Sequence, residues 1–148
     1  MSISLLFSIF LCRVFRYTIS NSRFSLLQTC SHSDYCQLCV KVYSKRSIAF
    51  VSSTDGLLCA YDFSFVEKLS RSTTIRLHQS GINDLDCTEI ESTNQLRLAT
   101  VGDDGSVHTV QFDPENWLWK QEFSQNCIHQ SPATGKIKLI FTCEMKIS

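Results

Sequence analysis

The sequence predicts an all-β protein built from a repeated unit of antiparallel strands. Three observations predict this fold class: a hairpin pattern that occurs twice, a histidine-led pattern that precedes each hairpin, and no stretch with the 3.6-residue apolar spacing of an amphipathic helix. With 148 residues, 43% of them hydrophobic, the chain is long enough for one ordinary core. Its five glycines and two prolines argue against a disordered or low-complexity chain.

The hairpin pattern occurs at Ile48–Phe63, IAFVSSTDGLLCAYDF, and again at Arg97–Phe112, RLATVGDDGSVHTVQF, at an offset of 49 residues without a gap. The dipeptide Asp-Gly falls in the same place in both copies, and apolar or β-branched residues alternate on either side of it. Asp-Gly is a favoured dipeptide for a two-residue hairpin turn, which needs positive φ. Each copy is therefore predicted to be a strand, a two-residue turn and a second strand.

A histidine-led pattern precedes each hairpin. His78 begins HQSGINDLDC and His32 begins HSDYCQLCVK, and their residues at steps of four, seven and nine correspond as positions of a first strand. Fourth strands are expected at Phe24–Thr29 and Trp117–Phe123. Four strands in about 45 residues is the size of one β-propeller blade.

Several residues of these units resemble WD-repeat proteins. His78, Thr100 and Asp104 match that family's buried hydrogen-bonding set of histidine, hydroxyl and aspartate. In the first unit His32 and Asp55 are expected to take the structural places of His78 and Asp104, and Tyr61 stands at the family's tryptophan position as a further structural residue. The match is degenerate, because Tyr-Asp and Val-Gln stand where the family has Trp-Asp, and serine and leucine stand where glycine precedes the histidine.

The resemblance implies a partial β-propeller of about three WD-type four-stranded blades. Because propellers usually have four to eight blades and unpaired strand edges are a liability, we expect the chain to be a fragment of a larger propeller. Residues 1–30 are expected to be the remnant of a preceding blade with an apolar N-terminal run, and 31–76 and 77–127 to be WD-type blades. Residues 128–148 are expected to be the incomplete start of a further blade.

The first twelve residues, MSISLLFSIFLC, have the apolar length of a signal-peptide core. No basic segment precedes the run and no small-residue cleavage site follows it, and roughly 18 apolar residues are needed to span a bilayer. A signal peptide and a strand both remain open here. We expect a cytoplasmic protein with no membrane partner.

Within the WD-repeat family, LHQSGINDLDC and LATVGDDGSVHTVQF are similar to the C-terminal repeats of the accessory subunit of the tRNA wobble-ribose 2'-O-methyltransferase. The resemblance implies a non-catalytic scaffold whose protein partner, the catalytic methyltransferase subunit, supplies the S-adenosylmethionine site. Contact with tRNA would come through that complex. The alternative is a general WD-repeat protein-interaction scaffold without an RNA link. Fourteen basic and fourteen acidic residues cancel, which is not the charge of an autonomous nucleic-acid binder.

Two clusters of residues could carry chemistry. Cys36 and Cys39 have the spacing of half a zinc site or of a redox pair, but no second such pair follows, and the repeat places them at apolar first-strand positions. His78 and Asp104 with a nearby hydroxyl have the residue types of a nucleophilic triad, but no Gly-x-Ser-x-Gly turn accompanies them. A histidine and an aspartate that recur once per unit fit a structural hydrogen bond. We therefore expect no catalytic residue, no cofactor, no metal and no small-molecule substrate.

Trp117 and Trp119 lie two residues apart, which on a strand places both rings on one face. Packing of the outer strand is one interpretation of this pair. If the rings are exposed, they are candidate contacts for a protein partner, because aromatic residues are enriched at binding hot spots.

Overall fold

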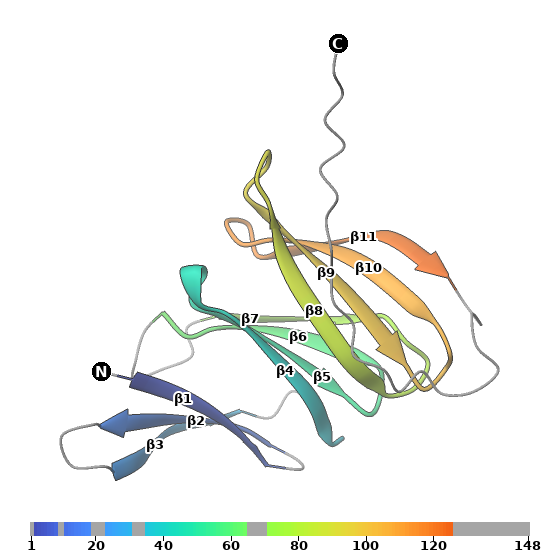
Figure 1. The fold of residues 1–148 in the computed structure, drawn as a ribbon. Coiled ribbons are helices and arrows are strands. Elements are labelled where there is room, and N and C mark those ends of the chain that lie inside the picture. The colour runs from blue at the N-terminus through green and yellow to red at the C-terminus, as the bar shows by residue number, and fades with distance from the viewer. Residues whose placement is uncertain (1, 9–10, 19–22, 31–34, 65–70, 126–148) are drawn as a thin grey trace.

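The structure, a computed structural model, describes residues 2–8, 11–18, 23–30, 35–64 and 71–125, and for 2–30 and 121–125 it describes the backbone alone. In these residues the chain is all-β, with three antiparallel sheets and a short 3-10 turn at Ser44–Arg46 (Figure 1). The part that the structure describes has no helix long and apolar enough to cross a membrane.

Each sheet is an antiparallel meander in which strands that follow one another in the chain are also neighbours in space. The first sheet contains β1 (Ser2–Ser8), β2 (Leu11–Thr18) and β3 (Arg23–Cys30). The second contains β4 (Gln37–Tyr43), β5 (Ile48–Ser53), β6 (Leu57–Asp62) and β7 (Arg71–Arg76). The third contains β8 (Ile82–Ile90), β9 (Gln95–Gly102), β10 (Val107–Asp113) and β11 (Leu118–Gln125).

The strands expected at 24–29 and 117–123 coincide with β3 and most of β11. The apolar N-terminal run contributes β1 and the start of β2. Sequence analysis did not identify β7, whose sequence RSTTIR contains one large apolar residue. His32 and the segment 128–148, where a further blade was expected to begin, lie outside the described residues.

The 49-residue repeat is exact in the pairing register of the two hairpins. Ser52 pairs with Leu58 in the second sheet, and Val101 pairs with Val107 at the equivalent position of the third. Equal pairing means that corresponding side chains point to corresponding faces of the two sheets, because side-chain direction alternates along a strand.

The predicted two-residue turns are wrong. Both hairpins close through three-residue loops, 54–56 and 103–105, and in the second the Gly102 N–H donates to the Ser106 carbonyl (3.3 Å). Within these loops only the glycines have positive φ, 80° at Gly56 and 70° at Gly105. A two-residue turn of the Asp-Gly type would force positive φ on the aspartate as well, whereas the three-residue loop leaves it in an ordinary conformation.

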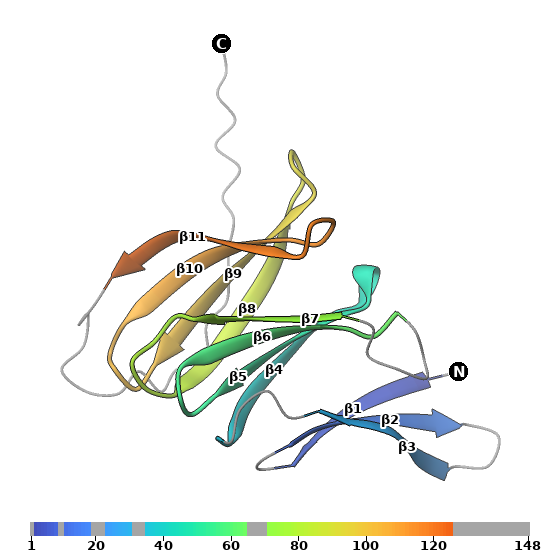
Figure 2. The same cartoon turned by 180° about the vertical axis from the view of Figure 1, so that it is seen from behind.

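The main core lies between the second and third sheets. Alternating residues of their central strands point into it and are almost fully buried: Ile48, Phe50, Leu58, Ala60, Leu96, Leu98, Val110 and Phe112. Both views place the β4–β7 sheet between the other two, and β8 runs beside β4 and β5 (Figures 1 and 2). The Ser52 hydroxyl joins the two sheets by donating to the Ile82 carbonyl at 2.9 Å.

The opposite face of the second sheet is buried too. Val51, Cys59 and Tyr61 form a smaller cluster there with Val40. A strand covered on both faces carries apolar residues at successive positions rather than at alternate ones. This explains the unbroken apolar run LLCAY of β6, every residue of which is buried except Leu57.

Strand β8 is an edge of the third sheet, and its aspartates cover part of that edge. Asp84 accepts the N–H of Leu85 and Asp86 accepts the N–H of Cys87, each at 2.9 Å. Asp86 also pairs with Lys41 of β4 at 2.6 Å. The acidic side chains of this strand therefore occupy its own backbone donors and link it to the neighbouring sheet.

Candidate functional site

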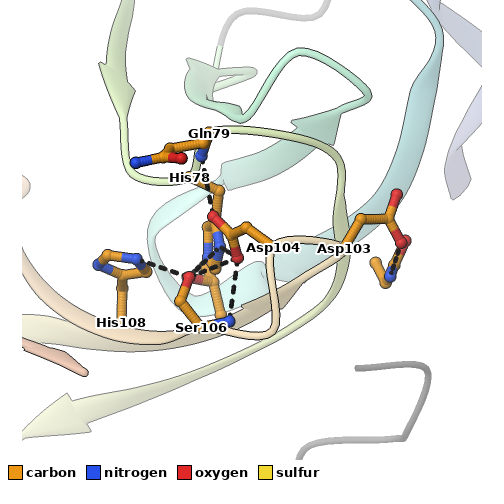
Figure 3. Close-up of polar contacts among 8 residues, drawn as sticks. His78, Gln79, Asp103, Asp104, Ser106 and His108 are labelled. Atoms are coloured by element: carbon orange, nitrogen blue, oxygen red, sulfur yellow. Dashed lines mark hydrogen bonds and ion pairs between the residues drawn. The ribbon is translucent and has the colours of Figure 1, made fainter. Parts of the chain in front are cut away.

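The candidate site lies where the segment between β7 and β8 meets the β9–β10 loop (Figure 3). His78 comes from that segment, Asp104 and Ser106 from the loop and its exit, and Thr100 and His108 from the adjoining strands. Four of these residues, His78, Thr100, Ser106 and His108, are at most 5% exposed, and Asp104 is partly buried. We call these five residues the histidine cluster.

Close backbone packing holds His78 in place. The N–H groups of Leu77 and His78 both donate to the Gly56 carbonyl of the preceding sheet, at 3.1 and 3.3 Å. A Cβ at Gly102 would lie 2.5 Å from His78 Nδ1, so the imidazole can rest against this strand only because residue 102 has no side chain.

The structure brings His78, Thr100 and Asp104 together. His78 Nδ1 lies 2.9 Å from Asp104 Oδ1, and Nε2 lies 2.9 Å from Thr100 Oγ1. The second carboxylate oxygen of Asp104 accepts the N–H of Gln79 at 2.9 Å. Asp103 instead points away and accepts a bond from Asn83 at 2.7 Å (Figure 3). The carboxylate of Asp104 thus ties the β9–β10 loop to the segment that enters β8.

Sequence analysis missed Ser106 and His108. The Ser106 hydroxyl donates to Asp104 and lies 2.9 Å from His78 Nδ1 and 3.0 Å from His108 Nε2. The two imidazole rings meet edge to face, with centroids 4.3 Å apart. The available signal was alternation, since His108 shares the inward face of β10 with Val110 and Phe112.

The charges of the cluster follow from this packing. Burial alone would raise the pKa of Asp104, but bonds from Ser106, His78 and two backbone N–H groups hold that pKa well below its usual range. The pKa of His108 is lowered, first by burial and then by the nearby His78. At neutral pH the cluster therefore contains an ionised carboxylate beside a neutral His108.

Asp55, which corresponds to Asp104 in the first unit, has other partners. Asp55 accepts a bond from the Ser53 hydroxyl, and its carboxylate lies 3.7 Å from Arg76. Tyr61 is buried in the second core cluster, and the placement of His32 is not described. In the described part of this unit, Asp55 is therefore held by an arginine of β7.

The chain from Thr100 through His78 to Asp104 has the order of a nucleophilic triad, with a hydroxyl on one ring nitrogen and a carboxylate on the other. Thr100 is fully buried, however, and its hydroxyl is hydrogen-bonded to His78 Nε2. A nucleophile must reach its substrate. The geometry therefore fits a buried hydrogen-bonded support better than an acyl-transfer site.

Trp117 is buried and Trp119 is half-buried, an arrangement that fits packing of the outer strand rather than a fully exposed pair. Trp117 is 7% exposed and precedes β11 with φ at 61°, and both rings contact Phe112, at centroid distances of 5.0 and 4.6 Å. Leu118 between them is exposed. Because Trp117 has left-handed backbone geometry, strand alternation does not govern the direction of its side chain.

Of the two cysteines expected on the first strand, Cys39 lies within β4 and Cys36 lies just before it. Cys39 packs against the main core, and its thiol lies 3.7 Å from Asp84. Burial and then the neighbouring Asp84 raise the pKa of Cys39, which disfavours the thiolate that metal binding and redox chemistry need.

Comparisons of the whole sequence with protein-family models and with curated proteins found no match.

Proposed function

We propose that this chain is a non-catalytic scaffold built from WD-type propeller blades. The observation that supports the proposal is the hydrogen-bonded chain from Thr100 through His78 to Asp104 within a four-stranded meander. In the WD-repeat family such a set fastens the segment that enters a blade to the turn between its second and third strands. Stacked meanders with a core between the second and third sheets suit the same architecture.

We infer that the three sheets are blades of a larger ring. The first sheet has the same meander order as the second and third, and its middle strand β2 ends near Tyr17, as β6 ends near Tyr61. By this correspondence β1, β2 and β3 take the second, third and fourth positions of a blade.

The protein's role is proposed to be that of an accessory subunit in 2'-O-methylation of the tRNA wobble ribose. This proposal rests on the similarity of the stretch HQSGIN to the repeats of such accessory subunits. Within it, His78 and Ile82 are buried, whereas Gln79 is exposed and Asn83 is half-buried. Ser80 is half-buried like Asn83, so Gln79, Ser80 and Asn83 are the side chains of this stretch that a partner can contact.

Co-purification tests this role. We expect the tagged full chain to recover a methyltransferase subunit and tRNA. Gln79→Arg should lower that recovery about tenfold, which corresponds to a loss of about 1.4 kcal/mol of binding free energy. Ser92→Arg, in the exposed β8–β9 turn, is the matched control and should leave recovery unchanged. Recovery of neither methyltransferase nor tRNA by the unaltered chain would overturn the accessory role and leave the fold proposal standing.

One observation favours a general protein-interaction scaffold as the second candidate. Five described basic side chains are engaged within the molecule: Lys41 with Asp86, Lys45 and Arg46 with Glu89, Arg76 with Asp55, and Arg71 with the Asn116 carbonyl. Phosphate binding needs basic groups that face the nucleic acid. Recovery of partner proteins without tRNA or methyltransferase in the same experiment would favour this candidate.

A further inference from the structure

Three atoms of the histidine cluster form a donor set suited to a metal ion. One ligand atom from each of His78, Asp104 and His108 lies within 4.8 Å of the other two. His78 Nδ1, Asp104 Oδ1 and His108 Nε2 are the atoms that face one another around the Ser106 hydroxyl. Two imidazole nitrogens and one carboxylate oxygen are a ligand set of Zn²⁺, which binds them at about 2.0–2.2 Å. Ligand atoms on a tetrahedral ion at that distance are about 3.4 Å apart, so small side-chain rotations would close the set around an ion.

We propose that His78, Asp104 and His108 bind one Zn²⁺ ion through these atoms, with water in the fourth position. The ion joins the segment before β8, the β9–β10 loop and β10 at one point. It thus links three pieces of the blade that otherwise meet through hydrogen bonds.

Nε2 of His78, the ring nitrogen that would not bind the ion, already has a fixed hydrogen-bond partner. Metal-binding histidines usually donate their other ring N–H to a fixed acceptor, which selects the tautomer and the ring orientation. Thr100 Oγ1, fully buried and 2.9 Å from His78 Nε2, supplies that acceptor. Without metal, His78 Nδ1–H donates to Asp104, so zinc binding requires the proton of Nδ1 to be replaced by one on Nε2. Thr100 Oγ1 accepts the Nε2–H, and Thr100 therefore acts as a positioning residue for the tautomer in which Nδ1 binds the ion.

Ser106 competes with the ion. Its hydroxyl lies among the three ligand atoms, 2.9 Å from His78 Nδ1 and 3.0 Å from His108 Nε2, and donates to Asp104. Without metal it joins these polar groups to one another. When Zn²⁺ binds, this hydroxyl turns aside, so removing it leaves every ligand in place and relieves the competition.

An ion can reach the cluster from the side of Asp104. The Asp104 side chain is 15% exposed, whereas the His78 side chain is fully covered. Asp103, the next residue of the same loop, is exposed and acidic. The solvent-facing loop therefore presents carboxylates to an approaching cation before the imidazoles complete its coordination.

Zinc binding by the full chain tests the proposal. Chelator-treated protein is titrated with ZnCl₂ against a chromophoric chelator, for the unaltered chain and for His108→Gln. We expect the unaltered chain to hold one more Zn²⁺ than His108→Gln, or to hold it at least about 100-fold more tightly, because a ligand is lost. His129→Gln is the matched control and should bind as the unaltered chain does. Zinc held by cysteines would be equal in all three proteins and cancels in the comparison.

Two further variants guard against a folding artefact, with circular dichroism as the check on each fold. Ser106→Ala should keep or tighten zinc binding, and Thr100→Val should weaken it about 10- to 100-fold while retaining all three ligands. Equal zinc stoichiometry and affinity in the unaltered chain and His108→Gln would overturn the proposal. Loss of zinc in Ser106→Ala to the extent seen in His108→Gln would overturn it as well. Neither result bears on the scaffold role.

Discussion

Gly56 and His78 are in direct backbone contact across two sheets. The His78 N–H donates to the Gly56 carbonyl at 3.3 Å, and a Cβ on Gly56 would lie 2.1 Å from the His78 carbonyl oxygen. The β5–β6 hairpin loop thus packs directly against the segment between β7 and β8 that contains His78.

Gly56→Ala should destabilise the protein by more than about 2 kcal/mol. The new methyl group meets backbone atoms that cannot turn away, and φ at this position is 80°, which disfavours any residue with a Cβ. Urea unfolding measures the loss. Thr54→Ala, in the same loop, should change stability by less than about 0.5 kcal/mol, and an equal effect of the two would contradict the packing described.

Asp104→Ala should lower the free energy of unfolding by about 1–3 kcal/mol, because His78, Ser106 and the Gln79 N–H lose their acceptor. Thermal or urea unfolding gives the value. Asp103→Ala is the matched control, since Asp103 is exposed and lies outside the histidine cluster, and it should cost about 0.5 kcal/mol or less. If Asp104→Ala were as mild as this control, the buried network would contribute nothing to stability.

Phe112→Ala should be among the most damaging core substitutions, at about 3–5 kcal/mol. The ring is fully buried and contacts Phe50 at 5.5 Å and Trp119 at 4.6 Å between centroids. Tryptophan fluorescence follows unfolding directly, because both tryptophans touch this residue. Phe112→Leu fills most of the space and should cost clearly less, so equal losses would argue against a cavity as the cause.

Cys59 should resist alkylation in the folded protein. Burial raises its pKa to about 12, so almost no thiolate exists at about pH 8, and only 1% of the residue is exposed. Iodoacetamide labelling followed by peptide mass spectrometry should leave it unmodified until denaturant is added. Cys36 is partly exposed and is the internal comparison. Labelling of Cys59 as fast as that of Cys36 would show that β6 is not buried.

The stability contribution of Glu89 should depend on pH in the acid range. Bonds from Tyr43 and Lys45 lower the pKa of Glu89 from its ordinary value of 4.5. As the pH falls below about 4.5, Glu89 therefore binds a proton in the unfolded chain before it does so in the folded chain. The contribution is therefore present above about pH 4.5 and is lost as pH falls through the folded-state pKa. The stability gap between the unaltered protein and Glu89→Gln should shrink from about pH 6 to about pH 3. A gap that stays constant over this range would contradict the pairing, and Glu91→Gln serves as the exposed control.

The hairpins of the second and third sheets could be predicted from the sequence because their signals are local. Alternation fixes which face a residue occupies, and the two copies share one pairing register. Strand β7 gave no such signal, because an outer edge strand buries little and its residues are mostly exposed or half-buried. The length of the hairpin loops could not be predicted from local rules either, because Asp-Gly is compatible with two-residue and with three-residue loops. In the observed three-residue loop 103–105, the Ser106 N–H donates a hydrogen bond to Asp104.

Three of the five residues of the histidine cluster could also be predicted. The repeat marks the positions of His78 and Asp104, and the resemblance to WD-repeat proteins adds Thr100, whereas Ser106 and His108 have no counterpart that marks them. His108 meets His78 from 30 residues away, through the packing of β10 against the segment before β8. Alternation predicts that His108 points inward, and only tertiary structure shows what it meets there.

The aspartates of β8 have a consequence for how the protein behaves at high concentration. An uncovered sheet edge is a template on which another chain can add a strand, and such growth leads to aggregation. Asp84 and Asp86 occupy the N–H groups of Leu85 and Cys87 and place negative charge along the same edge. A foreign strand would have to displace both carboxylates to reach these two donors, so this part of the edge resists fibre-like assembly by its own chemistry.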